Sequence, residues 1–144
     1  MIMKHPNHYD TDEMTSKRMA NVSLKRGEVE RMLSSRLWHS GLRFRVNYKK
    51  LPGSPDIAIL KHRIAVFVDG EFWHGYDWEQ RKPKLKRNRD YWIEKIEENI
   101  ARDKRVDAQL VLAGWIPVHF WSKEVRTNMD ACIEKIETLI QQKT

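Results

Sequence analysis

Cysteine and long apolar runs are the two things this sequence largely lacks. Cys132 is the one cysteine among 144 residues, which excludes an internal disulfide and any multi-cysteine zinc or iron–sulfur site. No apolar stretch of about eighteen residues occurs, so no transmembrane helix is expected. Residues 1–20 carry several charges and no apolar segment, so a secretory signal peptide is not expected either. These absences together predict a cytoplasmic protein.

Basic and aromatic residues are what the sequence has in excess. Lys and Arg number 27 against 20 Asp and Glu, a formal charge of +7, and 10% of the residues are aromatic. This balance favours a polyanionic partner such as nucleic acid, although many basic surfaces are only solvated. Residues 1–14 are polar and without periodicity and predict a flexible N-terminal arm, whereas 15–144 predict a single domain.

Hydrophobic periodicity predicts seven main elements. Apolar positions at helical spacing predict helices over residues 28–40, 90–113 and 128–142, with Val111 and Ile140 among the inward residues. Alternating or continuous apolar runs predict strands over 43–46, 56–60, 64–68 and 116–121. Residues 71–78 and 81–89 are expected to be loops. The order αβββαβα predicts an α/β fold, a mixed sheet with helices on both faces.

Four residues with acidic or imidazole side chains occupy positions from which they could meet in one cleft. Asp56 begins a predicted strand, His74 follows the central strand, and Glu30 and Asp103 lie on helices. Phosphodiester hydrolysis needs an activated water and a cation opposite the developing charge, and carboxylates suit Mg²⁺. A plainer alternative stays open from the residues alone: Asp56 caps a turn, and the other three are solvated polar side chains.

Three sequence blocks resemble the Vsr (very short patch repair) endonucleases, which have the PD-(D/E)XK restriction-endonuclease-like fold. The first is Pro-Gly-Ser-Pro-Asp at residues 52–56, the second is Phe-Trp-His at 72–74, and the third is Asn-Ile-Ala-Arg-Asp at 99–103. The resemblance covers residues 11–123, with the blocks in the family's order. One block alone would be weak support, but the three together are specific.

The resemblance implies a DNA endonuclease that uses Mg²⁺, with Mn²⁺ as a substitute, to hydrolyse a phosphodiester bond in duplex DNA. Asp56 is implied as the central metal ligand, and the backbone carbonyl of Val68 as a second ligand. His74 is implied as the general base or its partner. Glu30 and Asp103 are implied to orient a second histidine or metal-bound waters.

The sequence departs from the mismatch enzymes of this family at two places. Asp69 stands where those enzymes have a histidine, so it either alters proton transfer or adds a carboxylate to the metal site. Their structural zinc ligands correspond here to Glu71, Tyr76, Trp78 and Lys123, which are not a usual zinc set. We therefore expect no zinc, and a loop held by aromatic packing instead.

Aromatic and basic side chains supply the expected DNA contacts. The resemblance implies that Phe72, Trp73 and Trp92 wedge into the duplex, whereas the residues alone favour core packing for all three. A basic run is expected to contact phosphates, with a solubilising loop as the alternative. Its members are Arg81, Lys82, Lys84, Lys86, Arg87 and Arg89.

The family resemblance leaves the target open. Nicking near a T:G mismatch in DNA repair is one role, and the catalytic part of a restriction or homing-type endonuclease is another. A non-catalytic DNA-binding module is a third, although a module that only binds DNA would need none of Glu30, Asp56, His74 and Asp103. We expect a nucleoid-associated monomer whose partners include a DNA methyltransferase or repair proteins.

Overall fold

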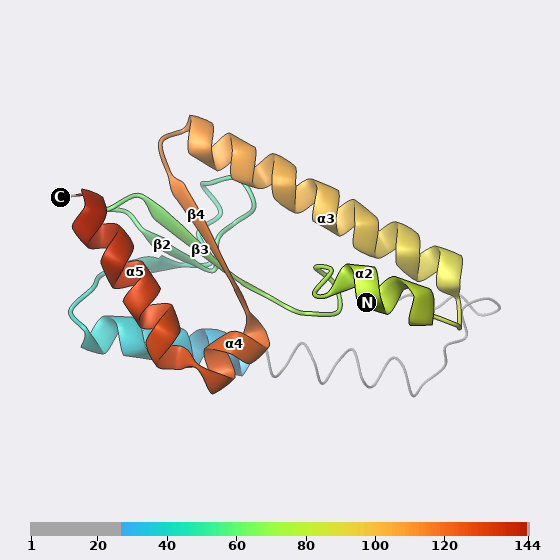
Figure 1. Ribbon diagram of the computed structural model, residues 1–144. Helices are drawn as coiled ribbons and strands as arrows, with labels where there is room; N and C mark the ends of the chain where they lie inside the picture. Colours follow the sequence, from blue (N-terminus) through green and yellow to red (C-terminus); the bar gives the residue numbers. More distant parts are fainter. Residues whose placement is uncertain (1–26, 144) are drawn as a thin grey trace.

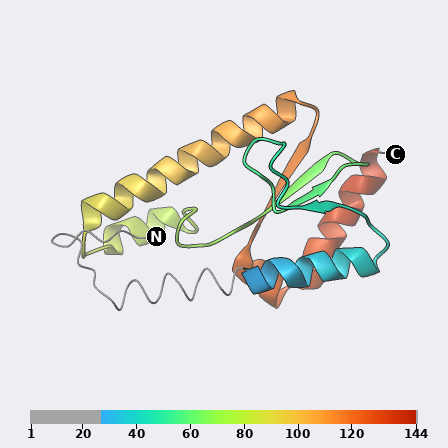
Figure 2. The same cartoon turned by 180° about the vertical axis from the view of Figure 1, so that it is seen from behind.

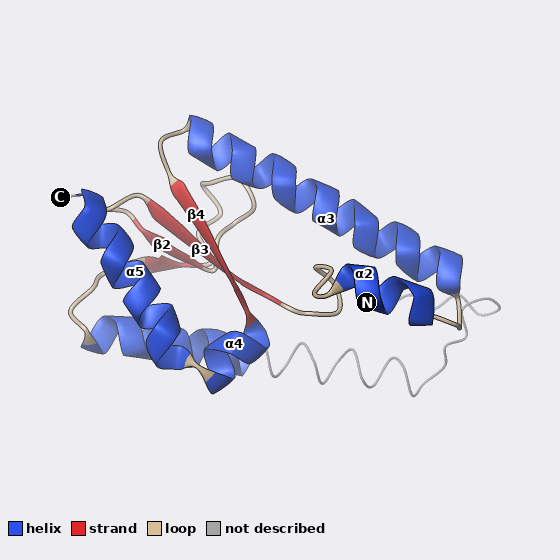
Figure 3. Ribbon diagram, viewed as in Figure 1, coloured by secondary structure: helices blue, strands red, loops and turns tan. Residues whose placement is uncertain are grey.

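The computed structural model describes residues 27–143, and there it is a mixed α/β fold with helices on both faces of a sheet (Figure 1). Figure 3 distinguishes the helices and strands by colour. The elements in chain order are a helix over residues 27–39, β1 (Arg45–Val46), β2 (Ile57–Ile59), β3 (Ile64–Asp69), α2 (Trp78–Arg81), the 3₁₀ helix η1 (Lys82–Lys84), α3 (Arg89–Leu112), β4 (Ile116–Trp121), α4 (Ser122–Thr127) and α5 (Met129–Lys143).

Within the described residues the sheet has four strands in the order β1-β2-β3-β4. The β1–β2 and β2–β3 pairs are antiparallel, and β3 and β4 are parallel. Parallel neighbours need a long crossover connection, which α3 provides here. The register sets Phe67 opposite His119 and Asp69 opposite Trp121. The end of β3 therefore lies beside the end of β4.

One face of the sheet is covered by the helix of residues 27–39 together with α4 and α5 (Figure 2). Val66 and Val68 of β3 point to this side and pack with Leu33 and Ile136 of the covering helices. All four side chains are buried, and burying an aliphatic side chain of this size contributes roughly 1.5–3 kcal/mol. This face is the main apolar core.

The opposite face packs against α3. Ala65 and Phe67 of β3 meet Leu110 of α3 there. Because side chains alternate along a strand, Asp69 follows Ala65 and Phe67 onto this face. The N-terminal half of α3 extends beyond the sheet and lies alongside α2 in both views (Figures 1 and 2). This overhang brings the turn after β3 against the middle of α3.

The predicted fold class is confirmed, and most predicted elements are present with small shifts at their ends. The strand expected over 43–46 is shorter, because only Arg45–Val46 pairs with β2. The loop expected over 81–89 is wrong in part, since it contains the end of α2, the 3₁₀ helix η1 and the first residue of α3. Helix α4 was not expected.

Val111 and Ile140, both expected to point inward, are buried to different extents. Val111 is 60% exposed although its neighbour Leu110 is fully buried against the sheet, so Val111 lies on the outer side of α3. Ile140 is partly buried and packs at the edge of the main core. The expectations for residues 1–14 and for the start of the domain fall outside the described residues and stay predictions. In the described part of the chain, no helix has the length and apolar character needed to cross a membrane.

Candidate active site

A cleft of about 460 Å³ opens on the α3 face of the sheet, where β3 ends. It is bounded by the turn before β2, the end of β3, the turn after β3 and the middle of α3. Polar and charged side chains dominate its wall. The lining residues are Gly53, Ser54, Asp56, Phe67, Val68, Asp69, His74, Arg102, Asp103, Val106 and His119.

Asp56 enters the cleft from the tight turn that precedes β2. Gly53 of that turn has φ +78°, and a side chain there would collide with Val106 of α3, so glycine is required for the close approach. The Asp56 Oδ2 atom accepts a hydrogen bond of 2.7 Å from the backbone N–H of Val68. This bond fixes the carboxylate beside the end of the central strand.

His74 and Asp103 form a close pair across the cleft. His74 lies in the turn after β3, and its Nδ1–H donates to Oδ2 of Asp103 on α3 at 2.6 Å. Both side chains are largely buried, with 16% and 24% of their surfaces exposed. Gly75 has φ +78°, and a Cβ atom there would lie 2.4 Å from Ile100 of α3. The glycine therefore lets the turn sit directly on α3, which is what brings His74 to Asp103.

A second histidine lies on the β4 side of the same cleft. His119 Nδ1 is 2.7 Å from Asp69 Oδ2, and His119 Nε2 is 2.7 Å from Asp107 Oδ1. Burial alone would lower the pKa of His119, but the hydrogen bonds and the charges of the two carboxylates outweigh it and raise that pKa to about 9. The ring also stacks on Phe67, with centroids 4.7 Å apart.

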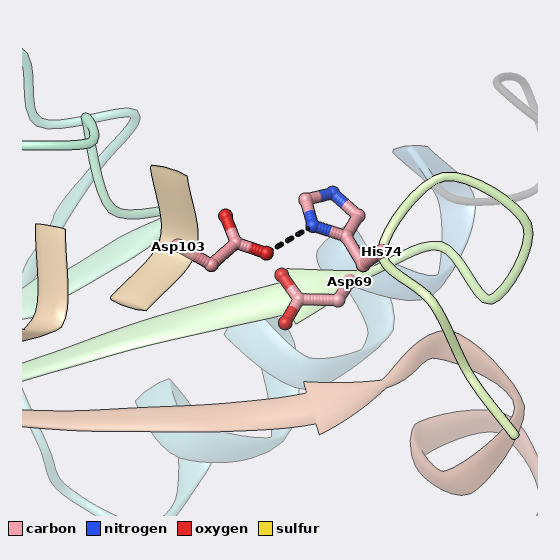
Figure 4. Close-up of side chains that lie close together, drawn as sticks. All are labelled: Asp69, His74 and Asp103. Carbon is pink, nitrogen blue, oxygen red and sulfur yellow. Dashed lines mark hydrogen bonds and ion pairs between the residues drawn. The ribbon is translucent and has the colours of Figure 1, made fainter. Parts of the chain in front are cut away.

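Three of these side chains could hold a metal ion together. Asp69, His74 and Asp103 each offer one ligand atom, and these atoms lie within 4.8 Å of one another. Figure 4 shows Asp69 at the end of β3, His74 on the following turn and Asp103 on the helix opposite, with their polar ends converging. Two carboxylates and one imidazole suit a divalent cation such as Mg²⁺ or Mn²⁺. The residues present therefore fit the metal that the family implies.

Of the other residues expected at the site, Asp56 and Val68 line the cleft and Glu30 does not. Asp56 lines the cleft but is not in the cluster of three. Val68 lines the cleft while its side chain lies in the apolar core on the other face, so its backbone is the part that faces the cleft. Glu30 lies on the helix of residues 27–39 and is not among the residues that line the cleft.

Phe72 and Trp73 of the turn after β3 pack against each other and against Trp92 of α3. Their ring centroids are 5.2–5.4 Å apart in edge-to-face contacts. Trp92 is 7% exposed, whereas Phe72 and Trp73 are only partly buried. Asn99 of α3 donates to the carbonyl of Trp73 at 3.1 Å. The cluster thus ties the turn after β3 to the first turns of α3.

The four positions expected to correspond to the family's zinc ligands carry other contacts. Glu71 accepts hydrogen bonds from Ser122 Oγ at 2.8 Å and from the backbone N–H of Lys123 at 2.7 Å. The ring of Tyr76 packs on Trp121 with centroids 5.1 Å apart. Trp78 donates to Glu97 of α3. Aromatic packing accounts for part of what holds this turn, and the carboxylate of Glu71 adds a polar link to α4.

The basic run divides into two groups in the structure. Arg81 donates to the carbonyls of Glu71 and Phe72, Lys82 pairs with Glu97 at 2.8 Å, and Arg89 donates to the carbonyls of Lys82 and Leu85. These three side chains brace the turn after β3. The other three members are exposed: Lys84, Lys86 and Arg87.

Sequence reasoning missed three residues that the structure places at or near the site: Asp107, His119 and Glu71. Asp107 follows Asp103 by four residues on a helix and so had to share its face. The strand of His119 was predicted, but its register against β3 was not. Glu71 has no local sequence signal for its contacts, because its partners lie more than fifty residues away in the chain.

A family model described as DNA mismatch endonuclease Vsr matches residues 8–80. The chain is 44% identical over 133 residues to the type II nicking enzyme V.NmeDIP of Neisseria meningitidis serogroup C, covering 92% of this chain and 90% of that protein. It is 41% identical over 134 residues to the type II nicking enzyme V.HpaIIP of Haemophilus parainfluenzae, covering 92% and 95%.

A third relative carries the family name itself. The chain is 34% identical over 111 residues to the DNA mismatch endonuclease Vsr of Escherichia coli strain K12, covering 77% of this chain and 70% of that protein. The class that these similarities define is therefore one of endonucleases, with nicking and mismatch enzymes among its members. Within that class, the chain belongs to the Vsr family. The resemblance carried by residues 52–56, 72–74 and 99–103 is thereby confirmed.

Proposed function

We propose that this chain is a Mg²⁺-dependent DNA endonuclease that hydrolyses a phosphodiester bond of duplex DNA and cuts one strand. The observation that carries the proposal is the His74–Asp103 pair, which faces Asp69 across a cleft that also contains Asp56. A base, its carboxylate partner and further carboxylates in one cleft are what phosphodiester hydrolysis requires. The names of the relatives agree with this chemistry.

His74 is the proposed general base. Its Nδ1–H is held by Asp103, so a neutral imidazole presents the lone pair of Nε2 to a water molecule. Asp103 fixes the tautomer and stabilises the imidazolium that forms when the water proton is taken. Arg102 lines the same cleft and is suited to contact a phosphate oxygen.

Asp56, Asp69 and the backbone carbonyl of Val68 are the proposed metal-holding groups. A bound Mg²⁺ would supply positive charge opposite the charge that develops on the scissile phosphate. Asp103 and His74 belong to the cluster of possible ligands, but their mutual hydrogen bond favours the proton-transfer role for this pair. Glu30 is retained as a supporting carboxylate, to be tested separately because it does not line the cleft.

The DNA is proposed to run over the overhang formed by α2, η1 and the N-terminal half of α3. Exposed Lys84, Lys86 and Arg87 are placed to contact phosphates, and this binding weakens as salt is raised. Phe72 and Trp73 are proposed as the wedge that enters a base step, with the buried Trp92 as the third member beneath them. The chain is proposed to act as a monomer in the cytoplasm on the nucleoid, alongside a DNA methyltransferase or repair proteins.

The activity is tested with supercoiled plasmid and with two linear duplexes that differ by one T:G pair. Nicked product that forms with Mg²⁺ and disappears with EDTA supports the proposal. DNA binding without cleavage under every divalent cation would indicate a binding module and contradict it. We expect the T:G duplex to be preferred by less than about a hundredfold, roughly 2.7 kcal/mol, because Asp69 replaces the family histidine and no zinc is expected to fix the wedge.

The His74→Ala variant tests the mechanism on the same substrates. Single-turnover cleavage is expected to slow by roughly 10²–10⁴, the usual contribution of a positioned acid or base. DNA binding, measured by fluorescence anisotropy, is expected to stay near the wild-type value. A rate within about threefold of wild type would assign His74 a structural role instead.

A further inference from the structure

His119 is engaged by a carboxylate on each side of its ring. Its Nδ1 faces Asp69 Oδ2 and its Nε2 faces Asp107 Oδ1, both at 2.7 Å. Carboxylates accept hydrogen bonds, so both ring nitrogens act as donors. The ring lies on Phe67 with an angle of 11° between the planes, which fixes its tilt. Three contacts from β3 and α3 therefore hold one imidazole in place.

The contact to Asp69 is the one that reaches the proposed chemistry. Asp69 is 8% exposed, and a buried polar group is stable only with hydrogen-bond partners. With Oδ2 bonded to His119, Oδ1 remains for another group. Figure 4 shows one oxygen of Asp69 on the side of the His74–Asp103 pair. The contacts of His119 on β4 and of Asp107 on α3 therefore set the orientation of Asp69 in the cleft.

We propose that His119, braced by Asp107, is a positioning residue that fixes the carboxylate of Asp69 for binding a divalent cation in the cleft. The inference rests on the proposed function only in taking Asp69 as a metal-holding group. Hydrogen bonds to ligand carboxylates orient them, and removing such a partner typically costs 10–100-fold in metal affinity or activity. Asp107 acts indirectly, since it contacts Nε2 of the imidazole and does not itself contact Asp69 in this arrangement.

The test uses direct Mn²⁺ binding to the full chain, measured by the electron paramagnetic resonance signal of free Mn²⁺. His119→Ala removes both hydrogen bonds and is expected to weaken Mn²⁺ binding by about ten- to a hundredfold. His119→Asn places an amide nitrogen near the position of Nδ1 and is expected to recover most of the affinity. Asp107→Ala leaves the contact between His119 and Asp69 in place. Its loss of Mn²⁺ affinity is expected to lie between those of His119→Ala and His119→Asn.

The matched control is Gln109→Ala, an exposed residue of α3 away from the cleft, which is expected to bind Mn²⁺ as the wild type does. Circular dichroism melting of each variant establishes that it is folded, and Asp107→Ala carries the test should His119→Ala be unfolded. Wild-type affinity in folded His119→Ala, or in Asp107→Ala in its place, would overturn the inference. Equal losses in His119→Ala and His119→Asn would also overturn it.

Cleavage assays on the same proteins separate this inference from the proposed function. Ordered losses of Mn²⁺ affinity without any DNA cleavage by the wild type would contradict the endonuclease proposal and support the positioning role. Cleavage by the wild type together with unchanged Mn²⁺ affinity in the variants would support the endonuclease proposal and contradict the positioning role. A purely structural role for His119 would lower the melting temperature without producing the recovery expected in His119→Asn.

Discussion

The two faces of the sheet differ although the same strand supplies both. On one face, Val66 and Val68 of β3 pack into a closed apolar core with α4, α5 and the helix of residues 27–39. On the other face, the side chains of Phe67 and Asp69 face α3 and a polar cleft. Because side chains alternate along a strand, successive residues of β3 face either the core that stabilises the fold or the cleft where the chemistry is proposed. A change on one face should therefore affect folding, and a change on the other should affect rate.

The largest expected effect comes from the cleft face, with Asp56→Asn. The variant keeps the shape of the side chain and a carbonyl oxygen to accept from Val68 N–H, but it removes a charge from the proposed metal site. Cleavage with Mg²⁺ is expected to fall by about a thousandfold or more, corresponding to several kcal/mol of lost charge stabilisation. DNA binding should persist. Cleavage at the wild-type rate would remove Asp56 from the mechanism.

The apolar face is expected to show the opposite pattern, with Ile136→Ala. Ile136 is fully buried on α5, and its truncation leaves a cavity that should lower the free energy of unfolding by roughly 2–5 kcal/mol. The cleavage rate per folded molecule should be unchanged. Urea denaturation and single-turnover kinetics measure the two quantities, with exposed Thr138→Ala as the control. A large fall in rate without loss of stability would contradict the separation.

A smaller effect is expected where the two regions meet, with Glu71→Gln. The substitution removes a charged acceptor from the bonds to Ser122 and Lys123, which join the turn after β3 to α4. Hydrogen bonds to a charged group contribute roughly 1.5–3 kcal/mol, an upper limit for this partly exposed link. Hydrogen exchange in residues 71–78 should rise, whereas Glu79→Gln on exposed α2 should leave it unchanged.

The same region bears on the expectation that zinc is absent. If Glu71 and the Tyr76–Trp121 contact hold the turn, purified protein should contain no stoichiometric zinc, and chelators should not loosen residues 71–78. Elemental analysis and hydrogen exchange with and without a chelator decide this. One zinc per chain would require ligands that the sequence does not indicate.

Much of the fold was predictable because its signals are local. The helical spacing of Val29, Leu33 and Leu37 and the apolar run of β3 need no knowledge of distant residues. Asp56, His74 and Asp103 were predictable from the motifs that contain them, and the cleft brings these three together. Glu30 was predicted from the same resemblance, but the cleft does not include it.

The remainder depends on contacts that no local pattern contains. His119 meets Asp69 only because β3 and β4 pair in one parallel register, and it meets Asp107 only because of how α3 is rotated. Six residues with one apolar side chain, Val125, give α4 too weak a period to predict. The link from Glu71 to α4 joins segments that are distant in sequence. Tertiary geometry decides all of these.

Asp69→Asn compared with Val66→Ala, two changes on opposite faces of β3, gives the most direct test of the central claim. The measurement is the single-turnover rate of duplex DNA cleavage at saturating Mg²⁺. The account predicts that Asp69→Asn slows cleavage by at least about a hundredfold while the protein stays folded. It predicts that Val66→Ala lowers stability and leaves the rate of the folded protein unchanged. Equal rates in the two variants, or a slower Val66→Ala, would contradict the assignment of the chemistry to the α3 face.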